Sequence, residues 1–317
     1  MSLFSLIDAP APDIAVEIAA GRVSAAAMER RGGRALISAH GVELLPPGAI
    51  VPSLTAVNTQ DRPAVMTALN RVLERVGRPR RVGLIVPDAV AKVSLVRFEQ
   101  VPIRSADLDQ LVRWQVRKAA PFPIENAQVT YVRGMQAPDG QEFIVAVARQ
   151  SVIEEYEGLC AEAGAHAGLV DLATFNVINS ALASAAPPDG DWLLVNVAVD
   201  SASIGILRGP HLIFFRNRTA DADGTVADLV HQTGMYYEDR LQGPGFSRVI
   251  LAGGSVAGAD IERLRLSLEQ RVATPVETID PRQAAALTDR ISAAPALLDS
   301  LAPLVGLLLR DRQTVTA

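Results

Sequence analysis

Residues 113–123 combine the residue types that dominate protein-binding surfaces. Trp114 lies beside basic residues on a predicted helix, and Arg117 follows at helical spacing. Pro121 and Phe122 then form a rigid apolar exit, because proline fixes the backbone. Tryptophan and arginine are enriched among the residues that carry most of the binding energy in protein interfaces. The pattern predicts one wall of a peptide-binding groove, formed by Trp114, Arg117, Pro121 and Phe122.

The competing interpretation is that Trp114 is buried in the core of its own domain. Leu108, Leu111 and Val112 precede it at spacings that gather apolar side chains on one helix face. A tryptophan in such surroundings usually packs inside the protein. The residue types alone leave both interpretations of Trp114 open.

The sequence contains no pattern typical of a catalytic or metal centre. Its four histidines are scattered without the spacing of metal ligands, and its single cysteine, Cys160, lies on the apolar side of a predicted helix, as a small buried hydrophobe does. Neither a Gly-x-Ser-x-Gly motif nor a Gly-Lys-Ser/Thr phosphate loop occurs. Zinc chemistry, this type of hydrolase and P-loop chemistry therefore have no support.

Charge and hydropathy disfavour nucleic acid binding and a transmembrane segment. The formal net charge of −5 provides no overall positive field for nucleic acid, so no nucleic acid partner is expected. The most apolar stretch, residues 296–309, is interrupted by Asp299 and falls short of the roughly 20 residues that span a bilayer. Residues 1–8 lack the basic and apolar parts of a signal peptide. We expect a cytoplasmic protein with no transmembrane segment of its own.

Two similar groups of secondary-structure elements are predicted. The first consists of strands at 14–18, 22–26 and 35–38, a helix at 63–76 with Asp61 as its N-cap, and a buried strand at 82–86. After a polar joint at residues 185–191, the order of hairpin, third strand, helix and buried strand recurs, ending at Gly253 and Gly254. This repetition predicts two related α/β halves.

A separate α+β unit is predicted inside the first half, at about residues 92–164. It contains a strand, a helix at about 106–119, a strand hairpin, and a second helix with a capping box at Ser151. The predicted division is therefore residues 1–188 for the first domain, which contains this insertion, and residues 189–317 for the second domain with the C-terminal helix.

Several landmarks follow one another in a recognisable order: Val86-Pro87-Asp88, residues 92–99, residues 114–122, Ala163-Gly164 with Asp171-Leu172, Gly253-Gly254, and residues 303–310. In this order and spacing they resemble the PilM family of type IV pilus assembly proteins across nearly the whole chain. The resemblance implies an actin-like ATPase (ribonuclease H-like) fold of two domains, with an extra α+β subdomain inserted in the first. In the wider superfamily of sugar kinases, chaperones and actin, a nucleotide lies between the two halves.

The positions that match the family's phosphate motifs have lost residues that the chemistry needs. By resemblance, Glu17 keeps the carboxylate of the first motif, but Ala19 replaces its glycine and Ser24 its lysine. Asn196 replaces the carboxylate of the second motif, which would hold the hydration shell of Mg²⁺. The adenosine-contacting turn is intact as Gly253, Gly254 and Ser255. These five positions, Glu17, Asn196, Gly253, Gly254 and Ser255, form a degenerate nucleotide site, and no catalytic or metal-binding residue is assigned.

The resemblance implies a scaffold that binds a protein partner. PilM proteins capture the cytoplasmic N-terminal tail of PilN, a bitopic inner-membrane protein, in a groove between the first subdomain and the inserted one. We therefore expect a PilN-like partner, contacts with other pilus platform and motor components, and a position at the inner membrane reached through that partner. Efficient ATP hydrolysis is not expected, and no cofactor is assigned with certainty.

Alternative functions remain for a chain of this type. One is a slow ATPase that binds Mg-ATP and uses the nucleotide state to control docking. Another is the equivalent component of a type II secretion platform. A filament-forming division protein is a third, but residues 310–317 are short and polar, whereas such a protein needs an amphipathic membrane helix there.

Two arginine-rich stretches, Glu29-Arg30-Arg31 and Arg78-Pro79-Arg80-Arg81, are predicted to lie in turns. Charged turns usually interact only with solvent. The same stretches are suited to an anionic lipid surface once a partner places the protein at a membrane.

Overall fold

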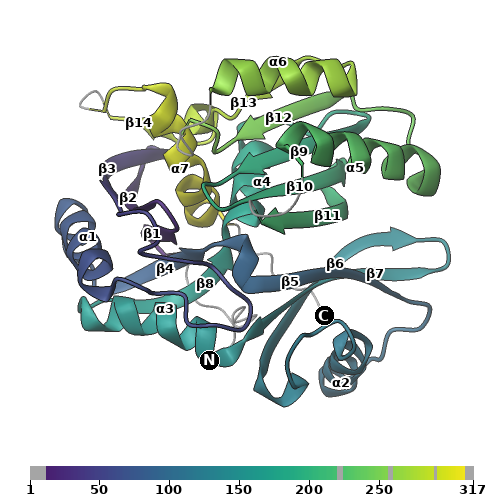
Figure 1. Ribbon diagram of the computed structural model, residues 1–317, viewed down its shortest axis with the longest axis horizontal. Coiled ribbons are helices and arrows are strands. Elements are labelled where there is room, and N and C mark those ends of the chain that lie inside the picture. The colour runs from purple at the N-terminus through teal and green to yellow at the C-terminus, as the bar shows by residue number, and fades with distance from the viewer. Residues whose placement is uncertain (1–11, 220–223, 256–259, 289–290, 311–317) are drawn as a thin grey trace.

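The computed structural model describes residues 12–219, 224–255, 260–288 and 291–310 (Figure 1). Two of the predictions above, for residues 1–8 and for the polar tail after Arg310, fall outside these ranges. Within them, no helix is long and apolar enough to cross a membrane.

The first half is built on a six-stranded sheet of order β14-β3-β2-β1-β4-β8. Its strands are β1 (Ile14–Ala19), β2 (Arg22–Arg31), β3 (Arg34–Leu44), β4 (Arg81–Val86), β8 (His166–Leu172) and β14 (Ala286–Leu287). The first three form an antiparallel meander, and β4 and β8 add in parallel to β1. Helices α1 (Arg62–Arg75) and α3 (Gln150–Glu162) contribute their apolar residues to one core cluster of this sheet.

Helix α1 illustrates how local sequence sets these elements. The Asp61 carboxylate accepts a hydrogen bond from the Ala64 amide at 3.0 Å and caps the helix, as predicted. Its buried residues, Val65, Ala68, Leu69, Val72 and Leu73, recur at helical spacing. Gly77 has a φ of 89°, the left-handed conformation that commonly ends a helix.

The second half repeats the first. Its five-stranded sheet has the order β11-β10-β9-β12-β13, which corresponds strand for strand to β3-β2-β1-β4-β8. The strands are β9 (Asp191–Val197), β10 (Ser201–Arg208), β11 (His211–Thr219), β12 (Arg248–Ala252) and β13 (Val276–Thr278). Helices α5 (Val226–Leu241) and α6 (Ile261–Val272) pack against it. The predicted pair of related halves is confirmed.

The inserted unit is a three-stranded sheet of order β5-β7-β6 with helix α2, at the lower right of Figure 1. Its elements are β5 (Ala91–Phe98), α2 (Ser105–Val116), β6 (Ala127–Ala137) and β7 (Gly140–Arg149). The predicted helix at 106–119 ends earlier, at Val116. Residues 117–119 form a turn, and Pro121, which has no amide hydrogen, does not continue the helix. Leu95 and Ile144, from the sheet of the insert, pack against a core cluster of the second half.

Helices α4 (Ala173–Ser184) and α7 (Pro295–Leu308) cross where the two halves meet, near the middle of Figure 1. Leu304 and Val305 belong to a core cluster of the first sheet, whereas Ala302 packs with residues of the second. The sequence assigned residues 189–317 to the second domain; in the structure β14 pairs with β3 and most of α7 packs on the first sheet. The boundary at residue 188 itself stays a prediction.

The crossing of α4 and α7 should depend on Gly306. A Cβ atom added there would lie 1.7 Å from the carbonyl oxygen of Asn176, so Gly306→Ala must push the helices apart. We expect a loss of at least about 2 kcal/mol in the free energy of unfolding, measured by urea denaturation. Gly158→Ala is the matched control, because this glycine of α3 has no atom within 4 Å of such a Cβ. The control should be neutral or stabilising, and equal stabilities of the two variants would contradict the packing described.

Candidate functional site

The turns that match the two phosphate motifs are in contact. One turn joins β1 to β2 and contains Gly21; the other joins β9 to β10 and contains Val199. A Cβ atom on Gly21 would lie 2.9 Å from Cγ2 of Val199, so the backbone of one turn meets the side chain of the other. A phosphate group entering between these turns would have to displace Val199.

The carboxylate of Glu17 is used within its own hairpin. It is buried, and it accepts hydrogen bonds from Nη2 of Arg22 at 2.7 Å and from Oγ of Ser24 at 3.0 Å. The Arg22 charge is thereby paired, and Ser24 provides no charge where the resemblance calls for a lysine. Nε of Arg22 is buried without a hydrogen-bond partner among the described residues.

Asn196 also has a structural task. Its Nδ2 donates to Oγ1 of Thr174 at 2.8 Å, which ties β9 to the start of α4. Its Oδ1 lies 2.9 Å from where a Cβ of Gly253 would be. A neutral amide held in this way does not supply the negative charge that a magnesium hydration shell prefers.

The intact glycine turn is explained by packing and by a carboxylate of the protein itself. Gly253 has a φ of 79°, and a Cβ there would lie 2.1 Å from the carbonyl oxygen of Val197, so only glycine fits. The amides of Gly253 and Ser255 donate to Oδ1 and Oδ2 of Asp299 at 3.2 and 2.9 Å. Burial raises the pKa of Asp299, while these hydrogen bonds and the nearby Arg22 act to lower it. Asp299, from α7, therefore occupies the anion-binding position of the turn.

Asp88 joins the two halves directly. This residue follows β4 in the first half and is buried, and its carboxylate accepts hydrogen bonds from the amide and hydroxyl of Thr174 and, at 2.7 Å, from Oγ of Ser203 in the second half. Nδ2 of Asn217 donates to the same Ser203 hydroxyl at 2.9 Å. Burial raises the pKa of Asp88, against the effect of its hydrogen bonds. Sequence analysis noted Asp88 only as a landmark after a buried strand and missed this role.

These residues do not fit Mg-ATP. Val199 contacts Gly21 across the phosphate turns, the carboxylate of Glu17 is paired with Arg22, and Asp299 accepts hydrogen bonds from the amides of the glycine turn. In the part of the chain that the structure describes, no cluster of three or more histidine, cysteine, aspartate or glutamate side chains could hold a metal ion. We therefore derive no chemical step through a nucleotide.

The predicted partner-binding residues lie on the surface of the insert. Trp114 is 71% exposed and lies on the face of α2 opposite its buried residues, so it is not a core residue. Arg117 and Pro121 are also exposed, whereas Phe122 is half-buried against the core of the insert. Trp114, Arg117 and Pro121 are thus available to a partner, and Phe122 anchors the turn that follows α2.

A second apolar wall comes from the loop between β3 and α1, which sequence analysis did not single out. Val51 and Val57 are exposed on this loop. Arg149, at the end of β7, donates to the carbonyl oxygen of Thr55, and Arg149 pairs in register with Ala127, which follows the Pro-Phe-Pro turn closely. The loop and the turn therefore flank the same end of the sheet of the insert. The apolar residues of this loop, among them Ile50, Val51, Leu54 and Val57, were the available sequence signal.

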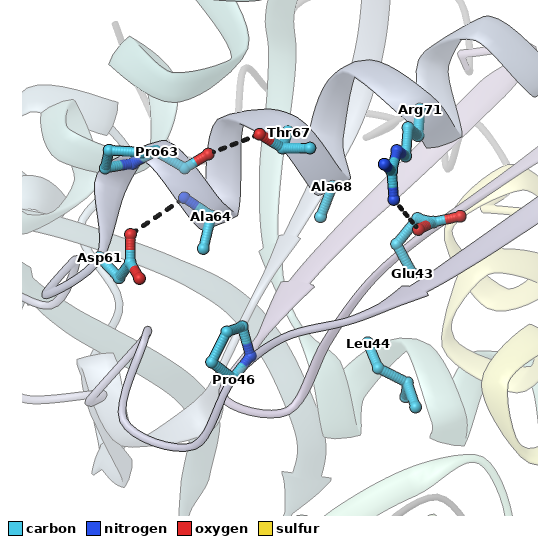
Figure 2. A pocket seen from close by; sticks show the side chains of 9 residues that line it. All are labelled: Glu43, Leu44, Pro46, Asp61, Pro63, Ala64, Thr67, Ala68 and Arg71. Carbon is cyan, nitrogen blue, oxygen red and sulfur yellow. Dashed lines mark hydrogen bonds and ion pairs between the residues drawn. The ribbon is translucent and has the colours of Figure 1, made fainter.

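A separate groove of about 390 Å³ lies between α1 and the end of β3 (Figure 2). Its charged groups are already engaged, since Glu43 pairs with Arg71 at 3.3 Å and Asp61 caps the helix. Leu44 is exposed at its edge. The groove offers no unpaired acid, base or nucleophile, so it is not a candidate catalytic site.

Because these residues do not fit Mg-ATP, the nucleotide should not stabilise the protein against heat. Millimolar ATP or ADP with Mg²⁺ should leave the melting temperature unchanged, because a ligand that does not bind the native state adds no stability. A ligand present at a hundred times its dissociation constant would instead add about 2.7 kcal/mol and raise the melting temperature by several degrees. Such a rise in a thermal-shift assay would contradict the description of the junction.

Comparison with known proteins agrees with this architecture. The family model described as type IV pilus assembly protein PilM matches residues 15–242. The solved PilM-PilN type IV pilus biogenesis complex is similar at 18% identity, with a TM-score of 0.78, covering 95% of this chain and 97% of that chain. A Bacteroides thetaiotaomicron protein with actin-like ATPase fold and unknown function is similar at 11% identity, with a TM-score of 0.51, covering 87% and 93%. The chain has the actin-like ATPase fold and belongs to the PilM family of type IV pilus assembly proteins.

Proposed function

We propose that this protein is a scaffold of the type IV pilus inner-membrane assembly platform that binds the cytoplasmic N-terminal tail of a PilN-like bitopic membrane protein. Membership of the PilM family supports the pilus role over a type II secretion platform. The similar solved structure is a complex of PilM with PilN. The observation that carries the proposal is the 71% exposure of Trp114 on the inserted unit.

The binding surface has the features needed by an extended apolar peptide. Trp114 and Pro121 on one side, and Val57 on the other, provide exposed apolar area that a peptide would remove from water. Because β6 is an edge strand of its sheet, it is suited to pairing with an added strand. Arg117 is exposed and attracts acidic residues that flank the apolar part of the tail.

Docking in this proposal does not require ATP hydrolysis. The halves are held together by Asp88 and Ser203, and the two phosphate turns contact each other through Gly21 and Val199. A slow ATPase would have to open both contacts before it could bind its substrate. The protein would be held on the cytoplasmic side of the inner membrane through its partner, together with other platform and motor components.

Trp114→Ala tests this site. The variant should bind a fluorescent peptide of the partner's tail at least about tenfold more weakly by fluorescence anisotropy, because exposed tryptophans often dominate the binding energy of interfaces. Its stability should barely change, since Trp114 contributes little to the core. Leu266→Ala is the control, because Leu266 is also exposed but lies on α6 of the second half. Unchanged affinity in Trp114→Ala would remove Trp114 from the site, and an equal loss in both variants would show that the effect is not local.

A further inference from the structure

The sheet brings the two arginine-rich stretches to one end of the first half. The amide of Met28 in β2 donates to the carbonyl oxygen of Asp13 at 2.9 Å. Since Ala15 pairs with Gly83, Asp13 is level with Arg81 at the start of β4. Neighbouring strands are about 4.8 Å apart, so the Met28 and Arg81 backbones are about 10 Å apart across two strand spacings.

The other arginines of the two stretches lie at the same end of the sheet as Met28 and Arg81. Arg30, Arg31 and Arg34 are exposed around the turn between β2 and β3, just beyond Met28. Arg80 and Arg78 are exposed in the loop that leads into β4. We call this surface the basic rim, and it consists of Arg30, Arg31, Arg34, Arg78, Arg80 and Arg81.

The basic rim carries excess positive charge on a chain whose net charge is −5. Arg31 pairs with Glu29 at 3.0 Å, and Arg78 pairs with Glu74. In the described ranges Arg30, Arg34 and Arg80 have no carboxylate partner. Among the described residues, Asp13 is a further carboxylate level with Arg81, and no ion pair joins the two. The rim therefore has the unneutralised cations that attract an anionic surface.

The same surface lacks what a protein partner usually requires. Protein interfaces are centred on exposed apolar or aromatic anchors that fit a pocket. None of the exposed large hydrophobic side chains of the described residues belongs to the rim. Exposed arginines with no apolar anchor among them suit a diffuse layer of negative charge. At an anionic membrane surface, each basic residue adds about fivefold in affinity.

We propose that the basic rim contacts the anionic lipid headgroups of a bilayer. It lies at the opposite end of β1 and β2 from the turn that contacts Val199. Helix α3 runs from the end of β7 toward the start of β8, at the lower left of Figure 1, and its 13 residues cover about 20 Å. A tail of about six extended residues would span that distance between the peptide-binding surface and the membrane.

Flotation with lipid vesicles tests the proposal without any protein partner. At low salt, the full-length protein should bind vesicles of phosphatidylglycerol and phosphatidylcholine, and it should not bind vesicles of phosphatidylcholine alone. About 0.5 M salt should abolish binding, because it screens exposed charges over a few ångströms. Arg30→Glu/Arg34→Glu should bind at least about tenfold more weakly.

The matched control is Arg240→Glu/Arg263→Glu, which makes the same change in net charge on exposed residues of α5 and α6. It should lose less than about threefold. Absence of binding by the unmodified protein, or equal loss in the two variants, would overturn the proposal. Binding to heparin through Arg30 and Arg34 without binding to vesicles would also overturn it, in favour of an acidic polymer. Circular dichroism spectra of each variant should match that of the unmodified protein, which checks that the variant is folded.

Discussion

The carboxylate of Asp88 is buried at the junction of the two halves, and the arrangement of the molecule depends on it. An ionised carboxylate in the interior is strongly destabilising unless hydrogen bonds compensate for the lost water. Thr174, at the start of α4, donates to both of its oxygens, and Ser203 of the second half adds a third hydrogen bond that forms only when both halves are in place. The contact of Val199 with Gly21 and the position of Asp299 against the glycine turn belong to the same closed arrangement.

A fixed junction also fixes the insert. Leu95 and Ile144 pack the sheet of the insert against the core of the second half, while its strands continue directly from the first half. The insert is therefore held by both halves, and helix α2, which carries Trp114, is pre-organised. Pre-organisation reduces the entropy lost on binding, which favours capture of a short flexible tail. We propose that the junction of the two halves, where the family's phosphate motifs meet, is in this chain a structural contact that supports the docking surface.

The repeated halves were predictable because alternating and helical patterns depend on residues close together in the sequence. The residue types left the exposure of Trp114 open, although a signal was available: at helical spacing Trp114 lies opposite the face of α2 that buries Leu108 and Val112. The losses at Ser24 and Asn196 were visible by resemblance. The replacement contacts were not: Asp299 was noted only as an interruption of an apolar stretch, yet it satisfies amides more than 40 residues away.

The most direct test of this account is the affinity for the partner's tail measured with and without Mg-ATP, using fluorescence anisotropy on the unmodified protein. If the junction is a structural contact that binds no nucleotide, the dissociation constant for the tail should be the same with and without Mg-ATP, to within about twofold. A tenfold change would mean about 1.4 kcal/mol of coupling between nucleotide and tail, and it would show that the junction opens to a nucleotide that controls docking.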